Sequence, residues 1–347
     1  MTFPQKITIA GGGLAGLSLG TGLRASGIPV EVFEATTYPR HRVCGEFISG
    51  IERSVLENLG VGDLLDDAVC NTTTGWFTDD GCFFESELPE PALGVSRFRL
   101  DAELARRFET AGGELRSGTR FSGTTEKSEG VILASGRPRR PQSQWIGLKA
   151  HLSDFPLEAH LEMHLGEEGY LGISRIEDGK ANACGLFRIR KSIKASKTKL
   201  LSAYLNSCGL HRLADRISRA QIDPDSCLGV SAFELGKQEE NADRDPEKIT
   251  IGDQFAIIGP FTGNGMTMAF QSAAIAVEPV SAFARGDLDW RDCREAVHKA
   301  LDAEFSRRIR VSNLLHPFLT GPARQKILVH LGRSRLIPFA FLLRMLR

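Results

Sequence analysis

Neither sign of charge is in excess in this sequence, whose 347 residues hold 43 Lys and Arg and 43 Asp and Glu. This balance argues against a polyanionic partner that binds along the whole chain, so we expect no nucleic-acid partner. Long apolar runs are also missing, because no stretch reaches the roughly 18 residues that indicate a membrane-spanning helix. The first residues lack the basic region, apolar core and cleavage site of a signal peptide. The sequence therefore predicts a cytoplasmic protein.

Cysteine pairs and histidine clusters are scarce as well. The seven cysteines are scattered and form no C-x-x-C motif, which argues against a disulfide framework and against a zinc cluster. His160 and His164 lie in the segment 158–165, where polar and apolar residues largely alternate, and this pattern predicts a half-buried strand. On a strand the two histidines would lie about 13 Å apart, too far for two ligands of one ion. We therefore expect no metal site.

A glycine-rich turn near the start of the chain is the first positive signal. The β-rich run 6–10 leads into Gly11, Gly13 and Gly16, and a helical pattern follows over 17–25. In such a turn the first glycine permits the tight bend, and the second lets the backbone approach a pyrophosphate. The third lets the helix pack closely on the strand. The order strand, glycine turn and helix predicts a dinucleotide-binding site.

An acidic residue follows at the distance that this motif requires. A second strand is expected over 29–33, and Glu34 comes eighteen residues after Gly16. A carboxylate there can accept hydrogen bonds from the ribose hydroxyls of an adenosine, and it disfavours a 2′-phosphate. The sequence therefore favours FAD or NAD over NADP.

A second motif, over residues 249–269, decides between these dinucleotides. A strand ends at Gly252-Asp253, a loop carries Pro260, and a helix is expected to begin near Gly265. Here the sequence resembles the flavoproteins that include p-hydroxybenzoate hydroxylase, geranylgeranyl reductases and flavin-dependent halogenases. Their pattern is Gly-Asp followed by PxxGxGxxxA. The resemblance covers residues 5–60, 95–151 and 245–280, and it implies FAD as the cofactor.

The resemblance also implies roles for individual residues. Asp253 would hold the ribityl chain of the FAD. Backbone N–H groups beyond Pro260, at the N-terminus of a helix, would face the flavin and stabilise negative charge on it. These groups belong to Gly263, Gly265 and Met266. Arg97, at the start of an expected helix, matches an arginine near the FAD phosphate and ribityl groups.

The segment 38–50 passes the flavin ring in related folds. Its Cys44-Gly45-Glu46 closely resembles the geranylgeranyl reductases. Gly45 would let the backbone approach the ring, while Glu46 would place a carboxylate near the ring or the substrate. Cys44 would act as a proton donor or substrate contact, or else as a small buried apolar residue. Arg42 would neutralise the FAD diphosphate.

One motif of the family is replaced. Its pyridine-nucleotide-dependent hydroxylases have Asp-Gly after a strand in the middle of the chain, where this sequence has Ser135-Gly136. This puts direct reduction by NADPH in doubt and leaves room for a separate electron donor. The basic cluster Arg137, Arg139 and Arg140 either attracts a phosphate or is a solvated loop.

The length predicts about two domains at roughly 150 residues each. Together with the resemblance, it implies an α/β protein with a Rossmann-type FAD-binding domain, an antiparallel-sheet substrate domain and a helical C-terminal tail. The expected FAD-binding segments are 1–72, 95–150 and 245–285, the substrate segments 73–94 and 151–244, and the tail 286–347.

The tail has a distinct composition. No acidic residue follows Glu304, whereas nine Lys and Arg accompany apolar runs. Such a tail could lie on an anionic bilayer or cap a lipid-shaped tunnel, which would make the protein peripheral to a membrane. The alternative is a set of helices packed on the FAD-binding domain, with their arginines in water.

Three functions remain open from the sequence. The Cys-Gly-Glu resemblance implies an FAD-dependent oxidoreductase that reduces carbon–carbon double bonds of a hydrophobic, isoprenoid-like or polyketide-like substrate. The second is a flavin-dependent monooxygenase that hydroxylates or epoxidises a hydrophobic or aromatic substrate. The third is a non-catalytic flavin-binding or maturation protein.

Overall fold

A five-stranded parallel sheet organises the first half of the fold. The computed structural model describes residues 4–123, 129–138, 143–231, 234–237 and 247–347. The strand order is β15-β7-β1-β2-β6, and all four pairings are parallel. The strands are β1 (Ile7–Ala10), β2 (Val30–Glu34), β6 (Glu114–Ser117), β7 (Val131–Leu133) and β15 (Ile249–Thr250). A sheet with this topology and a glycine turn after β1 confirms the predicted Rossmann-type domain.

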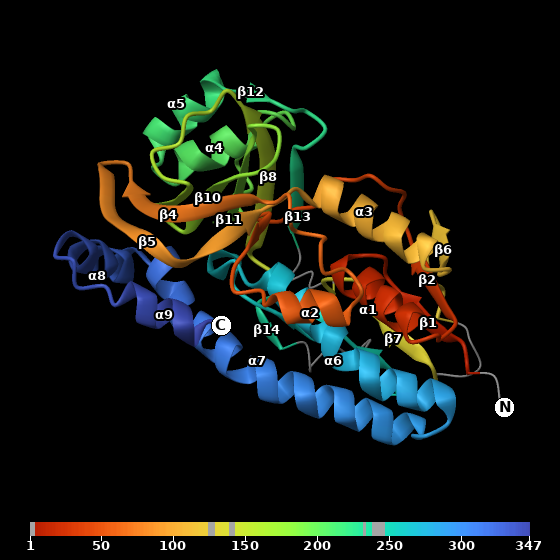
Figure 1. Cartoon of the computed structure of the whole chain (residues 1–347). Helices are drawn as coiled ribbons and strands as arrows, with labels where there is room; N and C mark the ends of the chain where they lie inside the picture. The colour runs from red at the N-terminus through yellow and green to blue at the C-terminus, as the bar shows by residue number, and fades with distance from the viewer. Residues whose placement is uncertain (1–3, 124–128, 139–142, 232–233, 238–246) are drawn as a thin grey trace.

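Four helices build the core around this sheet. Helix α1 (Leu14–Ala25) packs against α3 (Arg97–Thr110) and α6 (Gly265–Arg285). Helix α7 (Trp290–Thr320) lies along α6, as Figure 1 shows at the lower edge of the molecule. The short helix α2 (Arg53–Asn58) also contacts α6. Buried residues of α7 belong to the same core, so the first turns of the expected tail are part of this domain.

A larger, mostly antiparallel sheet carries the second half. Its order is β12-β8-β11-β10-β9-β4-β5-β3, with β13 paired to β8. Helices α4 (Leu200–Ser207) and α5 (His211–Arg219) cover one face of it, at the top in Figure 1. The strands are β3 (Phe47–Ile48), β4 (Val69–Thr78), β5 (Gly81–Gly94), β8 (Trp145–Ser153), β9 (Leu161–Gly166), β10 (Gly169–Arg175), β11 (Ala181–Arg188), β12 (Gln221–Ile222) and β13 (Leu228–Ser231).

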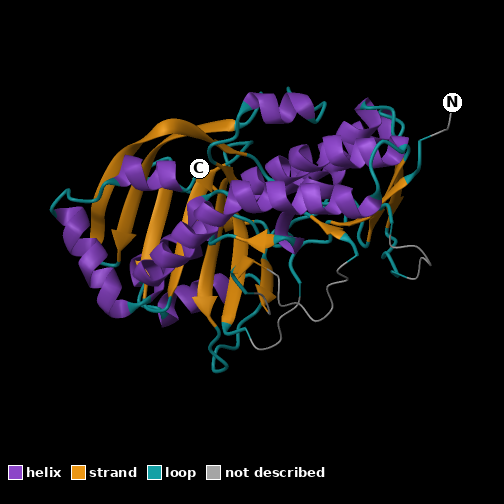
Figure 2. Cartoon of the chain, turned by 90° about the horizontal axis from the view of Figure 1, so that it is seen from below, coloured by secondary structure: helices purple, strands orange, loops and turns teal. Residues whose placement is uncertain are grey.

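The remaining elements connect the two sheets and cover the large one. A two-stranded ladder joins β14 (Gly236–Lys237) to β16 (Ala256–Ile257). Helices α8 (Pro322–Arg333) and α9 (Phe339–Met345) pack against β5, and Figure 2 shows the C-terminal helices lying across the large sheet. Among the described residues, no helix combines the length and apolar character needed to cross a bilayer.

Two details differ from the sequence prediction. The expected boundaries at 72/73 and 150/151 fall inside β4 and β8, because both strands continue without a break in the large sheet. The second difference is that the strand expected over 158–165 is almost fully buried, whereas the sequence predicts a half-buried strand. It begins at Leu161, and its polar residues Glu162 and His164 are buried, because Arg216 of α5 pairs with Glu162 and the ring of Phe77 stacks on His164.

Candidate active site

A cavity of about 240 Å³ lies between the two sheets. Loops and helix ends from segments far apart in the sequence line it, and Cys44 stands on its wall. Ten residues that the sequence assigned to the site line this cavity: Gly13, Glu34, Arg42, Cys44, Arg97, Asp253, Pro260, Gly263, Gly265 and Met266. The structure thus brings together most of the predicted cofactor site.

The glycine turn after β1 shapes one end of the cavity. Gly11 has a φ of +118°, and a Cβ there would lie 2.3 Å from the carbonyl oxygen of Ala134. A Cβ on Gly16 would lie 1.9 Å from the carbonyl oxygen of Gly11. On Gly13 a Cβ would meet only Arg97, at 3.9 Å, because this residue faces open space. Gly11 and Gly16 therefore fix the turn, and Gly13 leaves room for a pyrophosphate.

Glu34 stands at the end of β2, as predicted, but it already has partners in the protein. Its Oε2 accepts a hydrogen bond from the N–H of Gly12 at 3.0 Å, and Arg40 lies 2.8 Å from Oε1. Burial alone would raise the pKa of Glu34, but Arg40 and Arg42 lower it below its usual value. The side chain is therefore an anion. The Nε of Arg42 is buried without a hydrogen-bond partner among the described residues, and it lies 3.8 Å from the carboxylate of Asp101.

Arg97 begins α3 and faces the glycine turn. Its guanidinium makes two hydrogen bonds to the fully buried carboxylate of Asp101, at 2.6 and 2.9 Å. Desolvation lowers the pKa of Arg97, but Asp101 raises it above its usual value, so the side chain stays charged. A fixed cation beside Gly13 fits a diphosphate.

The N-terminus of α6 forms the opposite end of the cavity. Gly263 has a φ of +67°, and a Cβ there would lie 2.4 Å from the ring of Phe47. Helix α6 begins at Gly265, as predicted, and the side chain of Asn264 does not cap it. The first N–H groups of α6 are therefore available to a ligand with negative charge. Desolvation raises the pKa of Asp253, which also lines the cavity and lies 3.9 Å from Arg137.

The Cys44-Gly45-Glu46 segment divides between the cavity and the interior. Cys44 and Gly45 line the cavity, and a Cβ on Gly45 would meet nothing within 4 Å. Glu46 differs from its predicted position, because its carboxylate is fully buried and does not line the cavity. Its backbone is left-handed, with a φ of +52°, and its N–H donates to the Sγ of Cys44 at 3.4 Å.

Glu46 belongs to a buried network that the sequence analysis missed. Its Oε1 accepts hydrogen bonds from Lys149 at 2.5 Å and from the N–H of Arg97 at 2.8 Å. Its Oε2 lies 2.6 Å from the Nε2 of His151. Burial would raise the pKa of Glu46, but His151 and Lys149 lower it. The carboxylate therefore holds the start of α3, and with it Arg97, against the large sheet.

The register of the large sheet places this network beside the cavity. Met163, Gly172, Cys184 and Lys149 lie opposite one another across β9, β10, β11 and β8, so they share one face. The first three line the cavity, and the side chain of Lys149 reaches the carboxylate of Glu46. Burial raises the pKa of the Cys184 thiol to about 12, so it stays protonated.

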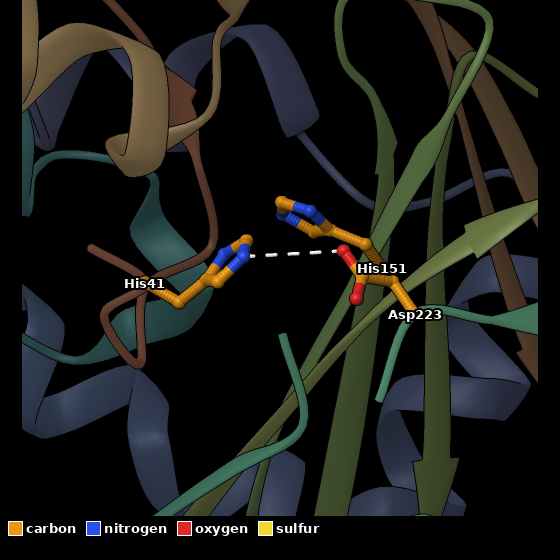
Figure 3. Close-up of side chains that lie close together, drawn as sticks. All are labelled: His41, His151 and Asp223. Carbon is orange, nitrogen blue, oxygen red and sulfur yellow. Dashed lines mark ion pairs between the residues drawn. The ribbon is translucent and has the colours of Figure 1, made fainter. Parts of the chain in front are cut away.

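Three side chains of the kinds that bind metal ions lie next to this network, and one of them, His151, belongs to it. His41, His151 and Asp223 each offer one ligand atom, and these atoms lie within 4.8 Å of one another. Figure 3 shows the ring of His41 pointing toward the carboxylate of Asp223, 3.9 Å away. His151 is already bonded to Glu46, and the ammonium of Lys149 beside it disfavours a cation. We therefore assign these residues to the network.

A second cavity of about 200 Å³ adjoins the first and shares Phe47, Leu161, Met163 and Phe261 with it. Within the part of the chain that the structure describes, no charged residue lines it. Its polar side chains among the described residues are the hydroxyl groups of Ser49, Thr74 and Thr262, and the indole of Trp76. The apolar part of its wall that comes from the C-terminal helices is Leu315, Phe318, Leu319, Leu328, Leu331, Phe339, Leu342 and Leu343.

The position of the missing Asp-Gly motif also lies on the first cavity. Ser135, Gly136 and Arg137 line it, and Ser135 Oγ accepts a hydrogen bond from Gln254 at 2.7 Å. Arg137 lies 3.9 Å from Asp253. Arg139 and Arg140, the other members of the predicted basic cluster, lie outside the described residues.

Comparisons with known proteins bear on the fold. No family model and no curated protein sequence matches the chain. Among solved structures, Klebsiella pneumoniae HpxO, crystallised with FAD and uric acid, is similar with a TM-score of 0.75 and 14% identity, over 98% of this chain and 97% of that one. p-Nitrophenol 4-monooxygenase PnpA from Pseudomonas putida is similar with a TM-score of 0.74 and 13% identity, over 100% and 97%. The flavin-dependent brominase Bmp2 is similar with a TM-score of 0.74 and 18% identity, over 99% and 93%.

These likenesses extend over nearly the whole chain and define the class of fold. The α/β architecture is that of the p-hydroxybenzoate hydroxylase type, as the sequence predicted.

Proposed function

We propose that the chain is an FAD-dependent monooxygenase that hydroxylates or epoxidises an uncharged hydrophobic substrate. The observation that carries this proposal is the pair of adjoining cavities. The first has a glycine turn, a fixed arginine and a helix N-terminus, and the second has a mostly apolar wall to which no described charged residue contributes. HpxO, PnpA and Bmp2 have the same fold, and the names of PnpA and Bmp2 state a monooxygenase and a flavin-dependent brominase.

The residues of the first cavity fit FAD. Gly13, Arg42 and Arg97 would hold the diphosphate, Glu34 the adenosine ribose, and Asp253 the ribityl chain. FAD supplies electron transfer and the activation of molecular oxygen when it is bound. The N–H groups at the start of α6 would stabilise negative charge on the reduced ring.

The substrate would lie between the two cavities. In the proposed reaction, substrate, O₂, two electrons and two protons give hydroxylated substrate and water. The apolar wall formed by Phe47, Met163 and Phe261 would exclude water from the reacting atoms. Cys44 stands on the wall of the first cavity, where it would contact the substrate or the ring.

The reductase predicted from Cys-Gly-Glu gains no support from these likenesses. A carboxylate that acts on the ring or the substrate would have to lie in the cavity, and Glu46 lies outside it. Ser135 in place of the acidic residue favours electrons from a separate flavin reductase or carrier. The third prediction, a flavin-binding protein without turnover, gives no reason for a second apolar cavity next to the first.

The experiment compares two matched compounds as substrates of the reduced, FAD-loaded protein. An uncharged alkylphenol should be hydroxylated when oxygen is admitted. Its analogue with a carboxylate on the alkyl chain should react at least about tenfold more slowly, because an unpaired charge is costly to bury in the second cavity. Reoxidation of the flavin by an unsaturated hydrocarbon without oxygen would instead show a reductase and contradict the proposal.

A further inference from the structure

Helices α8 and α9 carry apolar side chains both against the second cavity and toward solvent. Toward the protein, Leu328 and Leu331 of α8 and Leu342 of α9 line the second cavity. Toward solvent, Ile327 and Phe341 remain 53% and 60% exposed. A helix that only covers a cavity needs one apolar face and a polar outer face. The outer apolar side chains therefore need another explanation.

Exposed apolar residues concentrate in this part of the chain. Among the described residues, six large hydrophobic side chains are classed as exposed, and four of them lie between residues 314 and 341. Besides Ile327 and Phe341 these are Leu314 and Leu336, which are 72% and 65% exposed. Leu336 lies in the connection between α8 and α9. The outer side of these two helices thus carries three apolar side chains within fifteen residues.

Basic side chains accompany them. Lys326, Arg333, Arg335 and Arg344 are exposed on α8, on α9 and between them. The chain has no acidic residue after Glu304. Apolar side chains interspersed with cations are the composition of a surface that binds an anionic bilayer.

Of the carboxylates on the neighbouring strand β5, Glu90 pairs with Arg347 at the C-terminal end of the chain, whereas two others point away from α8 and α9. Phe84 and Leu88 line the second cavity beneath the helices. Glu85 and Glu87 alternate with them along the strand, and therefore point to the opposite face of the sheet. At the end of the hairpin, Asp80 lies 3.9 Å from Arg333, so this arginine has a competing carboxylate. Arg335 and Arg344 therefore serve better in a test.

We propose that the outer side of α8 and α9 docks on a bilayer that contains anionic phospholipid. Ile327, Leu336 and Phe341 would enter the interface, while the arginines would lie at the phosphate groups. Because the same helices wall the second cavity, docking would place that cavity next to the bilayer. Docking is independent of the proposed reaction, so either can fail alone.

The test measures cosedimentation of the FAD-loaded protein with vesicles. Binding to vesicles of phosphatidylcholine and phosphatidylglycerol is expected to exceed binding to pure phosphatidylcholine and to weaken with salt. Arg335→Gln and Arg344→Gln should each weaken binding about fivefold, since a basic residue near an anionic surface contributes about 1 kcal/mol. Phe341→Ser and Leu336→Ser should weaken binding to both compositions.

Matched controls lie on the other side of the large sheet. Ile189 is 37% exposed, and Lys191 and Lys194 are exposed in the loop after β11. Ile189→Ser and the double variant Lys191→Gln, Lys194→Gln should bind as the unchanged protein does. Equal binding to both vesicle types, or equal losses in the controls, would overturn the proposal. Self-association without vesicles that Phe341→Ser abolishes would also overturn it, because it would assign the face to a second copy of the chain.

Discussion

Glu46 shows how a single side chain holds the cavity wall in place. Its buried carboxylate joins Lys149, His151 and the N–H of Arg97, which come from the large sheet and from α3. The sequence places Glu46 beside a cysteine and a glycine that line the cavity, and this led to the prediction of a role at the ring. Its partners lie more than fifty residues further along the chain. Nothing local in the sequence shows which way such a side chain turns.

Replacing Glu46 by Gln should destabilise the protein more than it affects chemistry at the cavity. The amide keeps the size of the side chain but leaves the ammonium of Lys149 buried without a counter-charge. Breaking a buried pair in this way costs about 3–5 kcal/mol. Chemical denaturation of the two FAD-loaded proteins measures the loss. A loss below about 1 kcal/mol would show that the network is not a structural anchor.

The same network predicts a dependence of stability on acid. The pKa of Glu46 is lowered below its ordinary value of 4.5 in the folded protein. The unfolded chain therefore takes up its proton first, and the stabilisation is complete above pH 4.5 and is lost as pH falls through the lower folded pKa. The difference in unfolding free energy between the unchanged protein and Glu46→Gln should shrink as pH falls through this window. A difference that stays constant with pH would contradict the assignment.

Gly13 tests the dinucleotide end of the cavity. A Cβ there would meet only Arg97, at 3.9 Å, so a valine would occupy the space beside that arginine. We expect Gly13→Val to lose FAD binding while the protein without FAD keeps its melting temperature. Reconstitution with FAD and the ratio of flavin to protein measure binding, and circular dichroism measures melting. Full flavin content in this variant would show that the diphosphate lies elsewhere.

The sequence predicts where some elements begin better than it predicts which of their faces are buried. The start of α6 at Gly265 and the turn between β1 and α1 were predicted because glycines mark them, and the structure needs a positive φ at Gly11 and at Gly263. The burial of β9 was predicted wrongly. Its alternating pattern indicates one polar face, but Arg216 of α5 pairs with Glu162 and closes that face. An alternating pattern shows which side chains of a strand are polar. Those side chains are exposed only where no other element packs on them.

The contact between α9 and the β4–β5 hairpin predicts how a substitution in α9 affects the second cavity. The ring of Phe339 lies 5.3 Å from that of Phe84 and 6.4 Å from that of Trp76, and all three line the second cavity. Phe339→Ala should weaken binding of the alkylphenol and raise hydrogen exchange in α9, with flavin content unchanged. Because Phe339 is half-buried, the loss of stability should be smaller than the about 3–5 kcal/mol of a fully buried position. Loss of flavin together with ligand would show that the two cavities do not act separately.

The molecule as a whole depends on how its two sheets meet. The class of fold and most cofactor residues could be predicted, because their motifs are local and because the chain resembles flavoproteins with the same order of motifs. The second cavity could not, since its wall combines β4, β5 and β9 with the last thirty-odd residues of the chain. The composition of the tail indicated an apolar surface. Only the packing of α8 and α9 on β5 shows which side of it faces the interior.

In the reaction that we propose, oxygen activated at the first cavity would be transferred to a hydrophobic substrate held against the second. The most direct measurement is a single turnover of the reduced, FAD-loaded protein with ¹⁸O₂ and an uncharged alkylphenol, followed by mass spectrometry of the product. We predict one ¹⁸O atom in the product for each flavin reoxidised, less whatever fraction is released as hydrogen peroxide. Complete reoxidation of the flavin that leaves the phenol unlabelled and unchanged would contradict this proposal. Reoxidation of the flavin without oxygen, with formation of a reduced substrate, would contradict it as well.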